Sequence, residues 1–235
     1  MKVLPSTLNY QKTMKQKLTK DYLKYLNIEL YQSEDMFRYN TDTLILGSFL
    51  DDMPYKTVMD IGTNNGALLV YASHKKASKL IGVDIFKEAL DVAEVNLKNT
   101  NKEYELIHSR IQDLEHEKVD VVICNPPFFE MNNVTENKYY KAAMFEETMP
   151  LDDMFKAFRK FTKDNGIIYT LYPADRFPEF YETAKKYKLK FMRLRFVHEK
   201  NKPYALRFVV KMKIGPMTKV RIEQPIFVDN GEIIE

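Results

Sequence analysis

Residues 125–128, Asn-Pro-Pro-Phe, combine the groups that bind a planar amine. Each proline holds φ at about −65° and lacks a backbone N–H, so the segment extends neither a strand nor a helix. The apolar run before it, residues 119–124, predicts a buried strand. The motif therefore follows the carboxyl end of a strand, where open α/β sheets bind ligands. Its amide, bare carbonyls and ring suit hydrogen bonding and stacking; a proline-rich turn that packs a phenylalanine is the alternative.

A second motif joins an acidic strand end to a glycine-rich turn. A short apolar strand ends at Asp60, Gly62 and Gly66 follow, and an apolar helix then begins. Gly62 permits an unusual backbone conformation and a close approach of the main chain to a ligand. Gly66 is expected to let the helix start tightly against the strand. The third glycine of the dinucleotide fingerprint is absent, which disfavours a pyrophosphate ligand; an ordinary glycine-rich turn is the alternative.

A second carboxylate ends the next predicted strand. Asp84 lies 24 residues after Asp60, and an acid near this spacing typically accepts hydrogen bonds from ribose hydroxyls. Ile85 and Phe86 follow, and they could cover one face of an adenine. Taken alone, these residues fit an ordinary strand end and helix entry equally well. The order of glycine turn, acid and amine motif is what favours a function.

In this order the motifs resemble class I S-adenosylmethionine-dependent methyltransferases that act on amino groups. Together with residues 37–44, Phe-Arg-Tyr-Asn-Thr-Asp-Thr-Leu, they resemble more closely the bacterial tRNA1(Val) N6-adenosine methyltransferases, over roughly residues 30–230. The resemblance implies S-adenosylmethionine as cofactor and the anticodon stem-loop of a tRNA as partner. It also implies methyl transfer to N6 of the adenosine 3′ of the anticodon, at position 37 of the tRNA.

The resemblance implies roles for individual residues. The amine site would consist of Asn125, Pro126, Pro127 and Phe128. The cofactor site would consist of Asp60, Gly62, Asn64, Gly66, Asp84, Ile85, Gln112 and Asp113. Either Gln112 or Asp113 would contact the cofactor adenine. The residues expected to close over the donor or the target base are Phe37, Arg38, Tyr39 and Asp42, with a hydrophobic cap on the sheet as the alternative.

Positive charge is concentrated toward the carboxyl end, although the formal net charge is only +3. Residues 185–220 contain many lysines and arginines but a single acid, Glu199. Such a distribution indicates a polyanionic partner, against the alternative of a solvated lysine surface. The predicted RNA contacts here are Arg193, Arg195, Lys202 and Arg207. Residues 1–30 are also basic and are predicted to form an arm or a short helix.

Composition indicates a cytoplasmic protein. The single cysteine, Cys124, excludes an intramolecular disulfide, and its place in an apolar run predicts a buried thiol. The four histidines lack the spacing of a metal site, so no metal is expected. No apolar run is long enough for a membrane helix. We also expect no obligate protein partner.

The elements that must position these motifs alternate between strands and helices, which predicts an α/β fold with a Rossmann-like, seven-stranded methyltransferase sheet. The predicted strands are residues 57–61, 79–84, 104–108, 119–124, 167–172, 191–197 and 206–214, the last two forming a terminal antiparallel β-hairpin. The predicted helices are residues 43–50, 66–73, 86–99, 152–163 and 175–187. Asn165-Gly166 is expected to cap the fourth helix. Residues 31–235 are predicted to form one methyltransferase domain.

Four other functions compete with this interpretation. Methyltransferases of guanine N2 in RNA and of protein glutamine N5 also use an Asn-Pro-Pro-aromatic motif. A nicotinamide-dependent oxidoreductase would share the α/β layout, but it would require the missing glycine. A non-catalytic RNA-binding module is disfavoured by the intact acidic strand ends.

Overall fold

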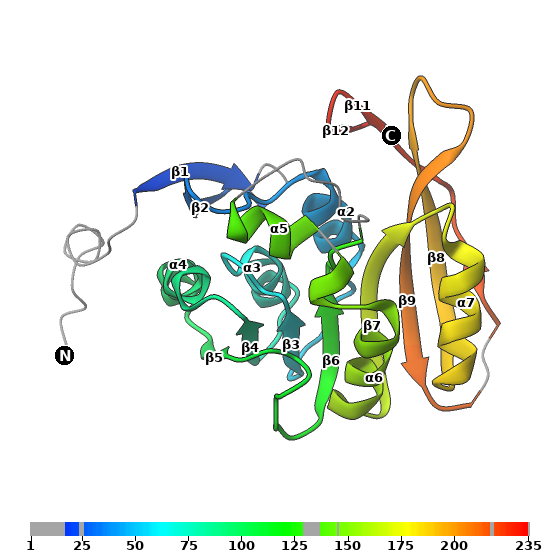
Figure 1. The fold of residues 1–235 in the computed structure, drawn as a ribbon, viewed down its shortest axis with the longest axis horizontal. Helices are drawn as coiled ribbons and strands as arrows, with labels where there is room; N and C mark the ends of the chain where they lie inside the picture. Colours follow the sequence, from blue (N-terminus) through cyan, green and yellow to red (C-terminus); the bar gives the residue numbers. More distant parts are fainter. Residues whose placement is uncertain (1–16, 24–25, 129–136, 145, 217–218, 235) are drawn as a thin grey trace.

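A ten-stranded sheet forms the centre of the molecule, shown by a computed structural model that describes residues 17–23, 26–128, 137–144, 146–216 and 219–234. Its strands are β3 (Thr57–Ile61), β4 (Lys79–Asp84), β5 (Glu103–His108), β6 (Val119–Cys124), β7 (Thr162–Pro173), β8 (Leu189–Glu199), β9 (Ala205–Ile214), β10 (Arg221–Ile222), β11 (Ile226–Asp229) and β12 (Glu232–Ile234). The order is β12-β11-β8-β9-β7-β6-β3-β4-β5, with β10 beside β8 (Figure 1). β3 to β7 run parallel, whereas β9 is antiparallel to both neighbours. The predicted α/β class, the seven strands and the β8–β9 hairpin are confirmed.

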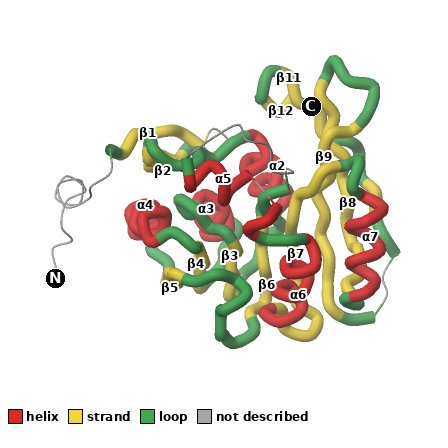
Figure 2. Tube along the Cα trace, in the orientation of Figure 1, coloured by secondary structure: helices red, strands yellow, loops and turns green. Residues whose placement is uncertain are grey.

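Five of the helices belong to two groups whose members contact one another (Figure 2). One group contains α2 (Thr41–Phe49), α3 (Ala67–His74) and α4 (Lys87–Leu97), which is followed by the 3-10 turn η1 (Lys98–Thr100). The other contains α6 (Leu151–Phe161), on β6 and β7, and α7 (Phe177–Lys186), on β8. α6 shows why these segments are helical, because its buried residues recur at helical spacing and its charges complement the helix dipole.

The amino-terminal described segment is a hairpin, and the predicted short helix is wrong for this part of the chain. β1 (Leu18–Leu23) pairs antiparallel with β2 (Ile28–Ser33), and Leu23 and Leu30 are fully buried. β2 packs on α4, and this tertiary contact decides between helix and strand where a short apolar pattern cannot. The predicted boundary at residue 30 falls inside β2, and residues 1–16 lie outside the described part.

The Asn165-Gly166 pair does not cap the preceding helix. α6 already ends at Phe161, and β7 begins at the next residue. Asn165 has a φ of 62°, and the β6–β7 register shifts between the Val119 and Val121 pairings. The pair therefore forms an irregularity at the start of a strand. Pro178 lies in the first turn of α7, where its missing N–H costs no helical hydrogen bond.

Three short strands that the sequence did not predict extend the sheet beyond β8. β11 runs parallel to β8 and pairs antiparallel with β12. The two-residue connection, Asn230-Gly231, has φ values of 48° and 79°, as a type I′ hairpin turn requires. Thr41 donates its hydroxyl hydrogen bond to the carbonyl of Gly231 at 2.6 Å, so this second terminal hairpin is attached to the start of α2.

The core agrees with the predicted role of the single cysteine. Cys124 is fully buried at the end of β6, and burial raises the pKa of its thiol.

No helix in the described part of the chain combines the length and the apolar character needed to cross a bilayer.

Candidate functional site

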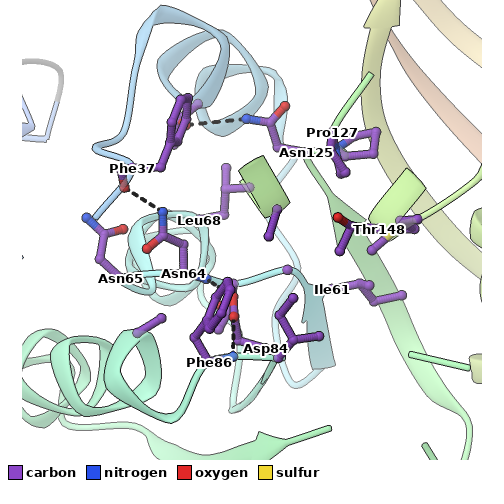
Figure 3. Close-up of a pocket in the computed structure, with 18 of the residues that line it drawn as sticks. Phe37, Ile61, Asn64, Asn65, Leu68, Asp84, Phe86, Asn125, Pro127 and Thr148 are labelled. Carbon is purple, nitrogen blue, oxygen red and sulfur yellow. Dashed lines mark hydrogen bonds between the residues drawn. The ribbon is translucent and has the colours of Figure 1, made fainter. Parts of the chain in front are cut away.

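A cavity of about 230 Å³ opens at the carboxyl ends of β3, β4 and β6. β3 lies between β4 and β6, and β4 is followed by β5 on the same side. This is the point of an open α/β sheet at which strand order diverges and ligands bind. The predicted site residues that line the cavity are Phe37, Arg38, Tyr39, Asp42, Gly62, Asn64, Asp84, Ile85, Gln112, Asn125, Pro126, Pro127, Phe128 and Arg207. Figure 3 shows Asn125 and Pro127 across the cavity from Asp84 and Phe86.

Asp84 is fixed by backbone hydrogen bonds at the mouth of the cavity. One carboxylate oxygen accepts from the N–H of Asn64 at 2.8 Å, and the other accepts from the N–H of Phe86 at 2.9 Å. Burial raises the pKa of this carboxyl, and the two backbone donors oppose that rise. Each carboxylate oxygen retains a further lone pair. The carboxylate is therefore preorganised to accept hydrogen bonds from a ligand.

Asp60 is placed differently from Asp84. Its side chain is buried and does not line the cavity, and neither carboxyl oxygen has a hydrogen-bond partner among the described residues. Burial raises the pKa of Asp60 to about 8; the nearby Thr63 hydroxyl opposes the rise, and the charge of Asp84 adds to it. A buried polar group without a partner is costly. Asp60 lies two residues before Gly62, the first glycine of the turn that a ligand would contact.

The two glycines of the turn serve different purposes. Gly62 has a φ of 73°, lines the cavity, and has no atom within 4 Å of the position that a Cβ would occupy. A side chain there would therefore extend into open space that a ligand can fill. Gly66 has a φ of 77°, and a Cβ at this position would lie 3.2 Å from that of Ala93. It allows α3 to approach α4, which corrects the expected approach to the preceding strand.

A buried asparagine on α4 holds the glycine-rich turn by hydrogen bonds to the main chain. This residue was not identified from the sequence. The side-chain amide of Asn96 donates to the carbonyls of Asn65 at 2.7 Å and Tyr31 at 2.9 Å. Its oxygen accepts from the N–H of Tyr31 at 2.7 Å. Asn96 follows Ala89, Val92 and Ala93 on the buried face of α4. A polar residue at apolar-face spacing was the available sequence signal.

Polar contacts also tie the segment before α2 to this turn. The side-chain amide of Asn64 donates to the carbonyl of Phe37 at 2.7 Å. Gln32 on β2 is buried, and its oxygen accepts from the N–H of Tyr39 at 2.9 Å. Arg38 pairs with Asp21 on β1 at 3.2 Å. The predicted residues of this segment therefore reach the cavity because β1 and β2 hold them there.

The amine motif forms the opposite wall of the cavity. The half-buried side chain of Asn125 donates a long hydrogen bond of 3.5 Å to the hydroxyl of Thr43 on α2. Phe128 is only 8% exposed, and its ring contacts Tyr172 edge to face at 6.2 Å. The guanidinium carbon of Arg207 lies 4.5 Å from the centre of the Phe128 ring. Aromatic and amide groups thus meet here, as the sequence predicted.

A short helix after the amine motif contributes to the wall of the cavity. α5 (Lys138–Met144) contributes Tyr139 and Ala142 to the lining, and the 3-10 turn η2 (Glu146–Thr148) follows it. Tyr139 contacts the Phe86 ring at 4.8 Å, and Tyr140 contacts the Phe37 ring at 5.7 Å. α5 therefore links the two sides of the cavity.

The two candidates for an adenine contact are placed unequally. Gln112 lines the cavity and donates to a carboxylate oxygen of Asp153 at 3.3 Å. Both residues are exposed, but Asp113 does not line the cavity. Geometry thus favours Gln112, although its role stays a prediction.

Three of the predicted RNA contacts lie away from the cavity. Arg193 pairs with Asp51 and Glu223, the latter at 3.0 Å. Arg195 donates to the carbonyl of Gln224 at 2.8 Å. The remaining residue, Lys202, is exposed in the β8–β9 turn and lies 3.4 Å from Glu199. Of the basic set only Arg207 is brought to the cavity, and the RNA-binding role of the others stays a prediction.

The described residues contain no group of three or more histidine, cysteine, aspartate or glutamate side chains arranged to hold a metal ion. The arrangement that they do contain is a pair of facing walls. One carries a fixed carboxylate and a bare stretch of main chain, and the other carries an amide and a ring.

Comparison with known proteins places this cavity in context. The family described as "Methyltransferase small domain" matches residues 32–150. A tRNA1(Val) (adenine(37)-N6)-methyltransferase from Phocaeicola vulgatus is 23% identical over 83% of this chain and 84% of its own length. The enzyme of the same name from Aliivibrio salmonicida is 26% identical over 75% and 77%. Among solved structures, the M. jannaschii tRNA m1G37 methyltransferase superposes with a TM-score of 0.62 at 15% identity, over 86% of this chain and 58% of that one. This last likeness concerns the fold alone.

Proposed function

The chain belongs to the methyltransferase small domain family, and from this premise we propose that it is an S-adenosylmethionine-dependent enzyme that methylates N6 of adenosine 37 in tRNA1(Val). The names of the relatives that align over most of the chain support this substrate. The observation that carries the proposal is geometric. Asn125 to Phe128 and Asp84 line opposite sides of one cavity, so an amine and a nucleoside cofactor can meet there.

The donor wall fits S-adenosylmethionine. The carboxylate of Asp84 would accept hydrogen bonds from the ribose hydroxyls, and the open space at Gly62 would admit the ligand against the main chain. Asp60 does not line the cavity, and its raised pKa leaves it largely protonated at neutral pH, so we assign it no direct contact with the amino-acid end of the donor. Ile85 and Phe86 would cover the adenine, with Gln112 at its edge. When bound, the cofactor supplies an electrophilic methyl carbon.

The amine wall would align and polarise the acceptor. The lone pair of adenine N6 is delocalised into the ring, so the nitrogen is a weak nucleophile. The side-chain oxygen of Asn125 and the carbonyl of Pro126 would accept hydrogen bonds from its two N–H groups. Acceptors fixed in this way stabilise the positive charge that develops on the nitrogen. In-line transfer depends on alignment, and the released proton can pass to water.

The RNA class follows from access to this wall. An adenine reaches the cavity only when it is unstacked, and a base in an anticodon loop costs less to extract than one in a duplex. Stacking on Phe128 would stabilise the extracted base by about 1–3 kcal/mol, as in single-strand readers. We place the reaction in the cytoplasm, on the anticodon stem-loop and without an obligate protein partner.

Asn125→Ala tests the proposal directly. Wild-type enzyme with unmodified tRNA should yield N6-methyladenosine at position 37 of tRNA1(Val), which nucleoside mass analysis and mapping of the labelled nucleotide detect. The variant should lose at least about 100-fold in kcat, as when an oxyanion-hole donor is removed. Its affinity for S-adenosylhomocysteine, measured by calorimetry, should stay within a few-fold of wild type.

Asn201→Ala is the matched control, since Asn201 lies in the exposed turn between β8 and β9. It should retain full activity. Undiminished methylation by Asn125→Ala would exclude the amine contact. If the product is N2-methylguanosine, the substrate is a guanine in RNA. If the methyl group appears on a protein glutamine, the substrate is a protein. Either result would refute the proposed substrate.

A further inference from the structure

We propose that the guanidinium of Arg207 covers the stacking face of Phe128 in the free enzyme and has to leave it before the target adenine can enter. This inference rests on the proposed function and concerns how its base site is controlled. It assigns Arg207 a positioning role, with Asp42 as the residue that holds it in place.

The first observation is that the guanidinium of Arg207 lies over the Phe128 ring. Only 8% of Phe128 is exposed, although it lines the cavity. Tyr172 is buried and makes an edge-to-face contact with the ring at 6.2 Å. The guanidinium of Arg207, which also lines the cavity, lies 4.5 Å from the ring centre. A base of similar size needs the position that the guanidinium now occupies.

The second observation concerns the groups that contact the Arg207 guanidinium. Arg207 lies near the start of β9, opposite Pro173 on β7 and Val197 on β8. Its Nη1 donates to the carbonyl of the adjacent Leu206 at 3.0 Å. Its Nε is 3.5 Å from a carboxylate oxygen of Asp42, which is longer than a strong charge-assisted hydrogen bond. A cation–π contact and an ion pair of this length are each modest. Stacking of a nucleobase is of comparable strength, so exchange of one for the other is feasible.

The third observation concerns the element that carries Asp42. The residue lies in the first turn of α2, and Asn125 contacts Thr43 one position later. Burial raises the pKa of Asp42, and the Arg207 charge opposes the rise. The residue that holds the guanidinium is thus one position away from the residue that orients the amine-binding amide. Entry of the base and alignment of Asn125 are therefore coupled through one helix turn.

Two substitutions test whether the planar guanidinium of Arg207 covers the Phe128 ring, independently of its positive charge. Arg207→Lys keeps the positive charge but lacks the planar fork that lies on the ring. Asp42→Asn keeps Arg207 and removes the charge that holds it. With S-adenosylhomocysteine bound, both variants should bind free adenosine several-fold more tightly than wild type, because the ring is easier to uncover. Phe128→Leu should bind it more weakly. Adenosine has no phosphate, so loss of attraction to RNA does not affect the result.

A spectroscopic measurement tests the same step without any methyl transfer. The Nε–H resonance of Arg207 should show a ring-current shift in wild type, which Phe128→Leu abolishes and which adenosine reverses. Unchanged or weaker adenosine binding by both variants, or a shift that adenosine leaves in place, would overturn the inference. If wild type instead makes no N6-methyladenosine while the shift persists, the proposed function fails and the covered ring remains.

Discussion

The two walls of the cavity differ in the length of the hydrogen bonds that hold their side chains. On the donor side, Asp84 and Asn96 make hydrogen bonds of 2.7–2.9 Å to the main chain. On the amine side, Asn125 reaches Thr43 at 3.5 Å, and Arg207 reaches Asp42 at 3.5 Å while donating to the carbonyl of the adjacent Leu206 at 3.0 Å. The residues of the donor wall are thus held closely by main-chain groups, whereas the side chains of the amine wall make longer contacts with one another. From this contrast we expect cofactor binding to need little rearrangement and base binding to need more.

The largest effect expected on the donor wall follows from Asp84→Ala. Two hydrogen bonds from ribose hydroxyls to a charged acceptor are worth about 1.5–3 kcal/mol each, so affinity should fall at least about 100-fold. Calorimetric titration with S-adenosylhomocysteine measures the loss. Asp91→Ala is the control, because Asp91 is on α4 and pairs only with the exposed Lys87 among the contacts described. Equal affinities for the two variants would mean that the ribose binds elsewhere.

Asp60, on β3, does not line the cavity, and its carboxyl lacks the backbone donors that hold Asp84. Folding raises its pKa from the ordinary value of 3.8 to about 8, so the folded chain binds more protons than the unfolded chain between these values. Stability from this group is therefore complete below about pH 4 and is lost as pH rises to about 8. The melting temperature should therefore decrease from pH 5 to pH 8, and this decrease should be larger for wild type than for Asp60→Asn. Parallel pH dependence of the two proteins would show that Asp60 is ionised at neutral pH.

The smallest effect expected concerns the support beneath the turn. Asn96→Ala leaves backbone groups of Tyr31 and Asn65 without their partner, which should lower the free energy of unfolding by about 1–3 kcal/mol. Donor affinity should fall several-fold while kcat at saturating donor is retained. Urea unfolding and the separate kinetic constants measure the two effects. Asn99→Ala, at an exposed position of η1, should change neither. A fall in kcat alone would place the role of Asn96 outside donor binding.

The sequence predicted the walls well, because their residues follow strands whose order is set by topology. Asp84, Gly62 and Asn125 each end or follow an apolar strand, and parallel strands bring such ends to one edge. What escaped prediction depends on contacts between distant segments. The β1–β2 hairpin is decided by packing on α4, and the pairing of Arg207 with Asp42 joins positions 165 residues apart. Pattern and propensity carry no information on such pairs.

The hydrogen bond from Thr41 to Gly231 has a practical consequence. It attaches the β11–β12 hairpin to the residue just before Asp42. The hairpin therefore helps to hold the start of α2, which lines the proposed base site. Proteolytic clipping after Val228, or a bulky affinity tag fused close behind this hairpin, would loosen that tether at a distance from every residue that handles the methyl group.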